Sequence, residues 1–322
     1  MKKKLLSMVM AIVSVVSVAF SGCGMEESAP DYSDSTLQFD FYGYSSASNG
    51  EWSIDGVSYS AGEDFRTVDR IREYKDVGMT IYLPQHQATF SGTNFEDSDM
   101  KKALDMAQEA GMMKVILTDQ RIQRLSKTNG GIVGEGKQFA TTEELDATIA
   151  DYIAPYKDHP AFYGLMLGDE PFYQMYESYG QVYKSLKRVC PDAFLQYNLN
   201  PITAGRDPQK IDERLPPLEE GEGEGLEWKD VVALRYEKYV RMFLDSTGAE
   251  YVQYDQYPMK DKDYIDEYYI YGLQLVAELA KEYGIDFYFV SQTCGQTDGV
   301  SNPRMLSEAA FFAFCPLITI IN

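Results

Sequence analysis

The stretch Ala161-Phe162-Tyr163-Gly164-Leu165-Met166-Leu167-Gly168-Asp169-Glu170-Pro171 is a run of apolar and small residues that ends in two acids and a proline. Such a run is typical of a strand covered on both faces, as the strands of a parallel sheet are. Charges at the end of a buried strand are costly to desolvate unless they are hydrogen-bonded or used in chemistry. Because α/β barrels hold their chemistry at the carboxyl ends of the strands, we expect Asp169 and Glu170 to lie at a functional rim.

On both sides of this stretch, strand-like apolar runs alternate with amphipathic helical segments. The expected strands are Leu37–Gly43, Gly78–Pro84, Met113–Asp119, Ala161–Gly168, Ala193–Leu199, Glu250–Tyr257, Asp286–Gln292 and Leu317–Ile321. The expected helices are Asp64–Asp76, Asp97–Ala110, Thr142–Tyr156, Phe172–Val189, Val231–Ser246, Asp263–Tyr283 and Pro303–Phe314. Eight strands alternating with helices predict an α/β fold, a (β/α)8 barrel that occupies residues 37–322.

A doubly wound open sheet is the rival architecture. It would usually need fewer strands and would bind its ligand where the strand order reverses. The sequence has no Gly-x-Gly-x-x-Gly or Walker-type loop, so the nucleotide-binding forms of that fold are disfavoured. Because no helix follows the last expected strand, we expect the barrel to be truncated after strand eight.

The N-terminus has the pattern of an export signal. Three lysines precede the apolar run Leu5–Phe20, which is too short for a spanning helix, so residues 1–22 are expected to be removed. The ending Phe20-Ser21-Gly22-Cys23 resembles a bacterial lipobox, which implies lipidation of Cys23, a tether over residues 23–36 and a lipid-anchored, extracytoplasmic place in the cell envelope. The alternative is an ordinary secretory signal followed by a free cysteine.

Composition excludes several classes of function. Removing residues 1–22 takes away three lysines and changes the formal charge from −21 to −24, so binding to nucleic acid is disfavoured by phosphate repulsion. Four scattered cysteines and two histidines give no metal-ligand spacing, and no nucleophile elbow is present. We therefore expect neither a metal nor another cofactor. The excess of tyrosine and phenylalanine fits sugar stacking, although for most single residues an aromatic core position is the better interpretation.

The segment from Tyr163 to Pro171 resembles the fourth-strand signature of a large clan of retaining barrel glycoside hydrolases, which ends in Asn-Glu-Pro. The chain has Asp-Glu-Pro instead, after the entry His159-Pro160-Ala161. The resemblance extends over roughly residues 37–321 and implies that Glu170 is the general acid/base, with Asp169 in place of the asparagine. The alternative is that Asp169 and Glu170 only cap the helix that starts near Pro171.

The resemblance fails at the second carboxylate. In the clan a nucleophilic Glu ends strand seven, whereas this chain has Gln292 there, which cannot act as a carboxylate. Asp255, at the end of strand six, is the first choice for the missing acid, with an equally weighted alternative as a turn residue before Pro258. Asp40 lies within strand one, and Asp119 is better explained as a cap of the next segment.

Further polar side chains are expected near the same rim, where amides and phenols could hydrogen-bond sugar hydroxyls. The expected substrate-binding residues are Asp40, Tyr82, Asp169, Asn198, Tyr257 and Gln292, with Gln85 and Asn200 as further candidates. His159 is interpreted as structural. The acidic insert Leu215–Glu227 is expected to be a solvated rim loop, too charged to pack.

These patterns together predict an exported, lipid-anchored glycoside hydrolase, monomeric, that acts on an oligo- or polysaccharide with a pair of carboxyl groups. The second hypothesis is a surface lipoprotein on a degenerate barrel that binds glycan without cleaving it. Gln292 and the missing eighth helix favour this second hypothesis.

Overall fold

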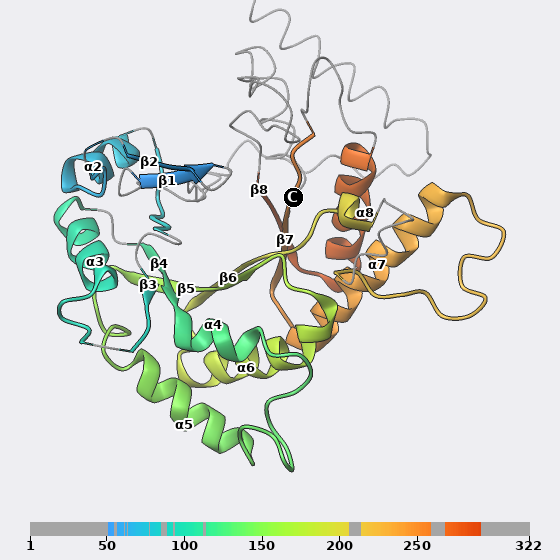
Figure 1. The fold of residues 1–322 in the computed structure, drawn as a ribbon, viewed down its shortest axis with the longest axis horizontal. Coiled ribbons are helices and arrows are strands. Elements are labelled where there is room, and N and C mark those ends of the chain that lie inside the picture. Colours follow the sequence, from blue (N-terminus) through green and yellow to red (C-terminus); the bar gives the residue numbers. More distant parts are fainter. Residues whose placement is uncertain are drawn as a thin grey trace, which may run out of the picture. The chain divides into compact units, whose positions relative to one another are not determined.

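The structure, a computed structural model, describes residues 51–54, 57–60, 62, 64–76, 78–84, 89–92, 94–111, 114–205, 214–258 and 268–290 (Figure 1). For residues 51–54 and 57–60 it describes the backbone alone. The expected first and eighth strands and the helix Pro303–Phe314 lie outside these residues. The same holds for Cys23, Asp40, Gln85 and Gln292.

The central strands are parallel and follow one another in sequence order. The strands β3 (Thr89–Phe90), β4 (Val115–Asp119), β5 (Phe162–Asp169) and β6 (Phe194–Asn198) form one sheet, and β7 (Tyr251–Asp255) pairs with β8 (Asp286–Val290). A bridge between Leu199 and Tyr254 joins β6 to β7. Among the described strands the order never reverses, so the doubly wound alternative is wrong and the (β/α)8 order is confirmed.

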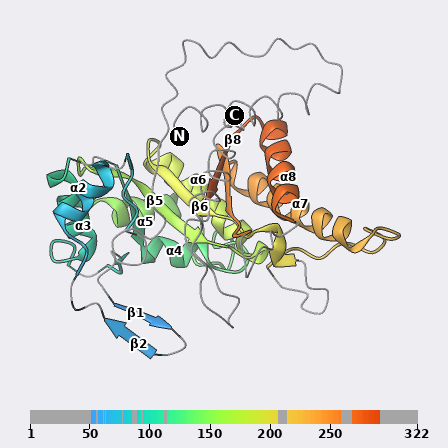
Figure 2. The same ribbon diagram turned by 90° about the horizontal axis from the view of Figure 1, so that it is seen from above.

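Helices connect these strands. They are α2 (Val68–Asp76), α3 (Asp99–Glu109), α4 (Gln120–Ser126), α5 (Thr142–Ile153), α6 (Tyr176–Val189), α7 (Trp228–Thr247) and α8 (Tyr268–Tyr283), with 3-10 turns η2 (Tyr173–Met175) and η3 (Ile202–Gly205) (Figure 2). Local chemistry sets their ends: Ser98 and Thr141 accept N-cap hydrogen bonds, and Gly248 ends α7 at φ 66°.

Sequence patterns missed two elements. An antiparallel hairpin of β1 (Glu51–Ile54) and β2 (Val57–Ser60) lies in what was expected to be a loop. Helix α4 directly follows β4, because the carboxylate of Asp119 accepts a hydrogen bond from the backbone of Arg121 and so caps a helix of only seven residues. A helix this short gives too few turns for its apolar periodicity to be recognised.

The two faces of the strands differ. Alternate residues such as Leu117, Leu165 and Leu195 face the helices and belong to one large apolar cluster, whereas Ile81, Leu83, Ile116 and Met166 form a small separate cluster. Gly164 allows close approach of β5 to β6, since a Cβ there would lie 1.9 Å from the carbonyl oxygen of Phe194.

Tyrosines fill the layer between α6 and α7. Tyr176, Tyr179, Tyr236 and Tyr239 are all buried, and Phe243 contacts the first two through edge-to-face rings. The excess of aromatic residues is therefore explained largely by the core, as expected. Within the described residues, no helix combines the length and apolar character that crossing a bilayer requires.

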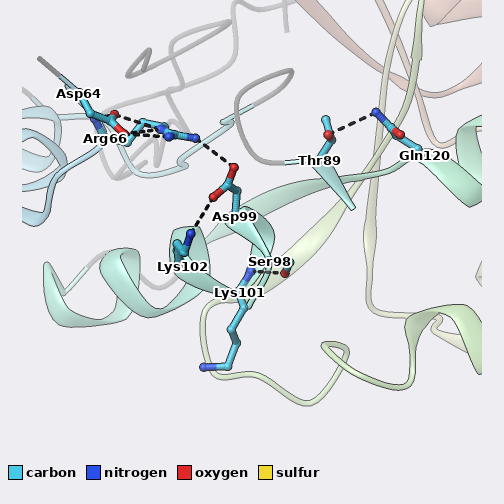
Figure 3. A network of polar contacts seen from close by, with 8 residues as sticks. All are labelled: Asp64, Arg66, Thr89, Ser98, Asp99, Lys101, Lys102 and Gln120. Carbon is cyan, nitrogen blue, oxygen red and sulfur yellow. Dashed lines mark hydrogen bonds and ion pairs between the residues drawn. The ribbon is translucent and has the colours of Figure 1, made fainter. Parts of the chain in front are cut away.

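Surface ion pairs hold the start of α3. Arg66 donates to both Asp64 and Asp99, and Lys102 donates to Asp99 from the next turn (Figure 3). In the same view the Gln120 amide donates to the Thr89 hydroxyl and so ties α4 to β3. These exposed pairs account for the charged residues here without a ligand.

Candidate active site

A β-bulge sets the direction of Asp169. The pairing of β5 with β6 shifts between Met166 and Gly168, so that Gly168 pairs with Tyr197 and Asp169 pairs with Asn198. Without the shift, alternation would have placed Gly168 on the face of Asn198. The bulge therefore brings the Asp169 carboxylate beside the Asn198 amide, whose Nδ2 donates to Asp169 Oδ1 at 3.0 Å.

Glu170 has a strained backbone. Its φ of 45° is the one positive value at a non-glycine residue in the described part of the chain. Such a conformation costs on the order of 1–3 kcal/mol and persists where the surroundings impose it. Here the Glu170 N–H donates to the carbonyl oxygen of Asn198 at 2.7 Å, which holds the turn.

The Glu170 side chain lies partly in solvent, 37% exposed, and its Oε2 is 3.8 Å from Nη1 of Arg214. Helix capping does not explain the two acids, because the next helical turn has Phe172 as its N-cap and α6 has Met175, neither with a side-chain cap. The capping interpretation of Asp169 and Glu170 is therefore wrong.

Asp255 ends β7 in a buried position, 5% exposed, and its Oδ1 has no hydrogen-bond partner among the described residues. The pKa of Asp255 is raised to about 6. Burial is the main cause and the charge of Asp169 acts in the same direction, while hydrogen bonding by Tyr257 and Asn198 acts in the opposite direction. The Leu199–Tyr254 bridge sets β7 beside β6, so Asn198 lies between the two aspartates.

Asn198 is thus the centre of the site. Its side chain is fully buried, its amide nitrogen serves Asp169, and its Oδ1 has no partner among the described residues. Tyr257, two residues beyond Asp255, is half-buried and contributes a hydroxyl. The structure therefore brings Asp169, Glu170, Asn198, Asp255 and Tyr257 together at the ends of three consecutive strands.

Asn200 has a different role. Its Nδ2 donates to the Pro171 carbonyl oxygen and to the Tyr239 hydroxyl, which itself donates to Pro171 at 2.7 Å. These bonds fix the loop after Glu170 to α7. The expectation that Asn200 contacts a sugar is therefore replaced by a positioning role.

Tyr82 does not lie at this rim. It pairs with Val115, the first residue of β4, whereas Phe90 pairs with Asp119, the last. The strand expected to end at Pro84 therefore reaches the rim only at Thr89 and Phe90. Tyr82 is buried and lines a separate cavity of about 300 Å³ with residues of α3, so its expected substrate contact is corrected.

Two other acidic or titratable residues are structural. Asp119 caps α4, accepts two side-chain bonds from Arg121, and accepts one from the Tyr156 hydroxyl at 3.0 Å. His159 accepts a hydrogen bond at Nδ1 from the Ala161 N–H, and its Nε2 lies 3.2 Å from Asp105. Both fit the structural roles expected from the sequence.

The acidic insert is anchored at its start, contrary to expectation. Leu215 is buried, and the buried Arg235 of α7 donates to the carbonyl oxygens of Leu215 and Pro216. Farther along, Lys238 pairs with Glu219 and Glu222. The charged insert packs against α7 because Arg235 bonds its backbone and Lys238 pairs with its side chains.

Sequence reasoning missed Arg214 and Tyr236. Arg214 lies in a segment without periodicity, so only the structure shows that it lies beside Glu170. Tyr236 is fully buried in α7 with a hydroxyl that has no partner among the described residues. Burial raises the pKa of Tyr236, and the charges of Asp255 and Glu170 add to that effect, which places this ring near both acids.

The site offers carboxyl groups in contrasting environments. Among the described residues, no group of three or more His, Cys, Asp or Glu side chains is arranged to hold a metal ion. What the arrangement can supply is a proton from a buried carboxyl group, a partly exposed carboxylate, and amide and phenol groups for hydroxyl recognition.

No protein-family model matches the chain, and no curated protein matches it either. Among solved structures, a provisional alpha-L-fucosidase from Bacteroides thetaiotaomicron is similar at 11% identity, over 86% of this chain and 83% of that one, with a TM-score of 0.45. A beta-mannanase from the blue mussel Mytilus edulis is similar at 11% identity, over 70% of this chain and 80% of that one, with a TM-score of 0.37. The beta-glucuronidase of Ruminococcus gnavus is similar at 14% identity, over 79% of this chain and 37% of that one, with a TM-score of 0.38. The fold assignment rests on the strand pairing of the chain itself.

Proposed function

We propose that the chain is a glycoside hydrolase whose catalytic pair is Glu170 and Asp255. The observation that supports this most directly is their setting. Asp255 is a buried carboxyl group with a pKa of about 6, and Glu170 is a partly exposed carboxyl group on a strained backbone. The two lie at the ends of β7 and β5, the strands on either side of β6. Perturbed titration and backbone strain at one strand-end rim are both typical of catalytic sites. Glycosidic cleavage needs one group to protonate the leaving oxygen and a carboxylate to attack or activate water.

The substrate in this proposal is an oligo- or polysaccharide. Asp169, Asn198 and Tyr257 would hydrogen-bond sugar hydroxyls beside the catalytic pair, since each places a donor or acceptor at the rim. Asp40 and Gln292, which lie outside the described residues, stay in the proposal as further substrate contacts.

The proposal includes export and anchoring. Residues 1–22 would act as a signal peptide, Cys23 would carry the lipid, and the tether to residue 36 would hold a monomeric enzyme at the cell envelope. Incorporation of labelled fatty acid into the expressed chain tests this. The label should be lost in Cys23→Ser, and an unlabelled wild-type chain would argue for an ordinary secretory signal.

Activity is tested with the full chain against aryl glycosides and glycans of varied sugar and linkage. We expect Glu170→Gln and Asp255→Asn each to reduce the release of reducing ends from glycans, whose leaving groups need a proton, by at least about 100-fold. Glu278→Gln and Asp192→Asn make the same chemical changes at exposed positions and should keep wild-type rates. Full activity in either catalytic variant would refute the assigned pair.

A non-catalytic glycan-binding lipoprotein is the second candidate, favoured by Gln292 at the position where the clan has its nucleophile. Calorimetry on the same glycans separates the two. Binding without any product release by the wild-type chain would select this candidate.

A further inference from the structure

We infer that Asp255 donates the proton to the leaving oxygen and that Glu170 is the carboxylate that attacks or activates water. This is the reverse of the roles that the resemblance implies for Glu170. The inference rests on the proposed function and goes beyond it by assigning each carboxyl group its step. It stands on the different surroundings of the two groups.

The surroundings of Asp255 favour its neutral form. The group is 5% exposed, and one of its oxygens has no hydrogen-bond partner among the described residues. Asp169 on β5 lies near enough for its charge to oppose ionisation of Asp255. Asn198 on β6 holds that opposing carboxylate in place through the 3.0 Å bond to Oδ1.

Among the described residues, the groups that act on the pKa of Asp255 include no compensating cation. Tyr257 hydrogen-bonds the carboxyl group and Tyr236 of α7 lies close enough to respond to its charge, but both are phenols. Burial beside a second carboxylate raises the pKa of Asp255 to about 6, so this group holds its proton up to mildly acidic pH, well above an ordinary aspartate. A proton donor requires this property.

The surroundings of Glu170 favour the charged form. Its side chain is 37% exposed, so water can solvate the carboxylate, and the Arg214 guanidinium lies 3.8 Å from Oε2. The positive φ turns the chain at this residue, and the backbone bond to Asn198 fixes that turn. Glu170 is thus held as a partly solvated anion beside a cation.

The step balances without a cofactor. The bond between C1 and the leaving oxygen breaks with its electron pair on that oxygen, which takes the proton from Asp255. Glu170 either forms a bond to C1 or removes a proton from the water that does. In the first route, water later hydrolyses the glycosyl ester and returns a proton to Asp255. In the second, the proton on Glu170 passes to solvent and Asp255 takes up a proton from solvent.

The test compares leaving groups. Dinitrophenolate leaves without protonation, whereas an alkyl leaving group needs a proton. Loss of the proton donor should therefore lower kcat/KM, which reports the cleavage step, only for the alkyl glycoside. With the sugar that the wild-type chain turns over, the kcat/KM of Asp255→Asn should fall at least about 100-fold for the alkyl glycoside and less than about 10-fold for the dinitrophenyl glycoside. Glu170→Gln should lose comparable factors on both.

A measurement on the wild-type chain alone guards against misfolded variants. The alkaline limb of the pH profile of kcat/KM should be present for the alkyl glycoside and absent for the dinitrophenyl glycoside. The roles are refuted if Glu170→Gln shows the leaving-group dependence, or if the alkaline limb is the same for both substrates. Turnover of no glycoside at all would instead refute the proposed function, and this inference with it.

Discussion

Asn198 donates one hydrogen bond to Asp169 across the pair β5 and β6, at 3.0 Å, and on its other side it lowers the pKa of Asp255. One neutral amide therefore separates two aspartates that repel each other. We predict that Asn198→Ala lowers the free energy of unfolding by about 1–3 kcal/mol, because the Asp169 carboxylate loses the hydrogen bond that this amide donates. Urea unfolding measures this.

The matched control for that change is Asn129→Ala, at an exposed residue, which should stay within about 0.5 kcal/mol of wild type. Equal stability of both variants would show that the amide does not hold the aspartates.

Asp255→Asn should stabilise the protein at neutral pH. The folded pKa of about 6 lies above the ordinary 3.8, so the folded state binds more protons than the unfolded state between these values. Wild-type stability therefore falls as pH rises from about 4 to 6, by about 3 kcal/mol from this group. The gain in Asp255→Asn should approach that amount above pH 6 and vanish near pH 4. Thermal unfolding across this range is the measurement.

The contrasting variant is Asp119→Asn, which removes the buried partner of Arg121 and Tyr156 and should be destabilised by several kcal/mol. If Asp255→Asn also lost stability at pH 7, its ionised form would not be strained by burial.

Glu170→Gly should leave stability unchanged or raise it by up to about 1 kcal/mol, because glycine accepts a φ of 45° without steric cost. Glu278→Gly, in the middle of α8, should instead cost about 1 kcal/mol. Denaturant midpoints of the two variants are compared with wild type. A clear loss in Glu170→Gly would mean that the side chain, and not the backbone, stabilises this turn.

Arg235→Met should release the start of the acidic insert, since it removes both bonds to the carbonyl oxygens of Leu215 and Pro216. We expect proteolysis by a Glu-specific protease, within residues 219–227, to become at least about 5-fold faster. A 5-fold change corresponds to about 1 kcal/mol in the free energy of local opening. Lys238→Met, which removes only exposed ion pairs, should change the rate much less. Equal rates in Arg235→Met and wild type would contradict the anchoring.

The rim could be predicted from the sequence where apolar runs end in polar residues. The ends of β5, β6 and β7 follow this pattern, and Asp169, Asn198 and Asp255 meet there as their positions in sequence suggested. The strand around Tyr82 was misjudged because Pro84 looked like its end, whereas pairing resumes at Thr89.

Other features have no signal in a single sequence. The bulge after Met166 reverses the alternation that would have pointed Asp169 away from Asn198, and a bulge depends on the pairing of two strands, not on one. Arg214 reaches Glu170 from a segment distant in sequence, so neither periodicity nor spacing could indicate it.

Every described strand pairs with its neighbour in the chain, and the interval between Leu199 and Tyr254 is the longest that such a pairing has to close. The entropy of closing a loop grows with its length, and longer intervals slow folding. Asp169 and Asn198 come together through a shorter interval. Asp255 joins them across the longest one, so the repelling carboxylates meet at the pairing with the largest loop-closure cost among the described strands.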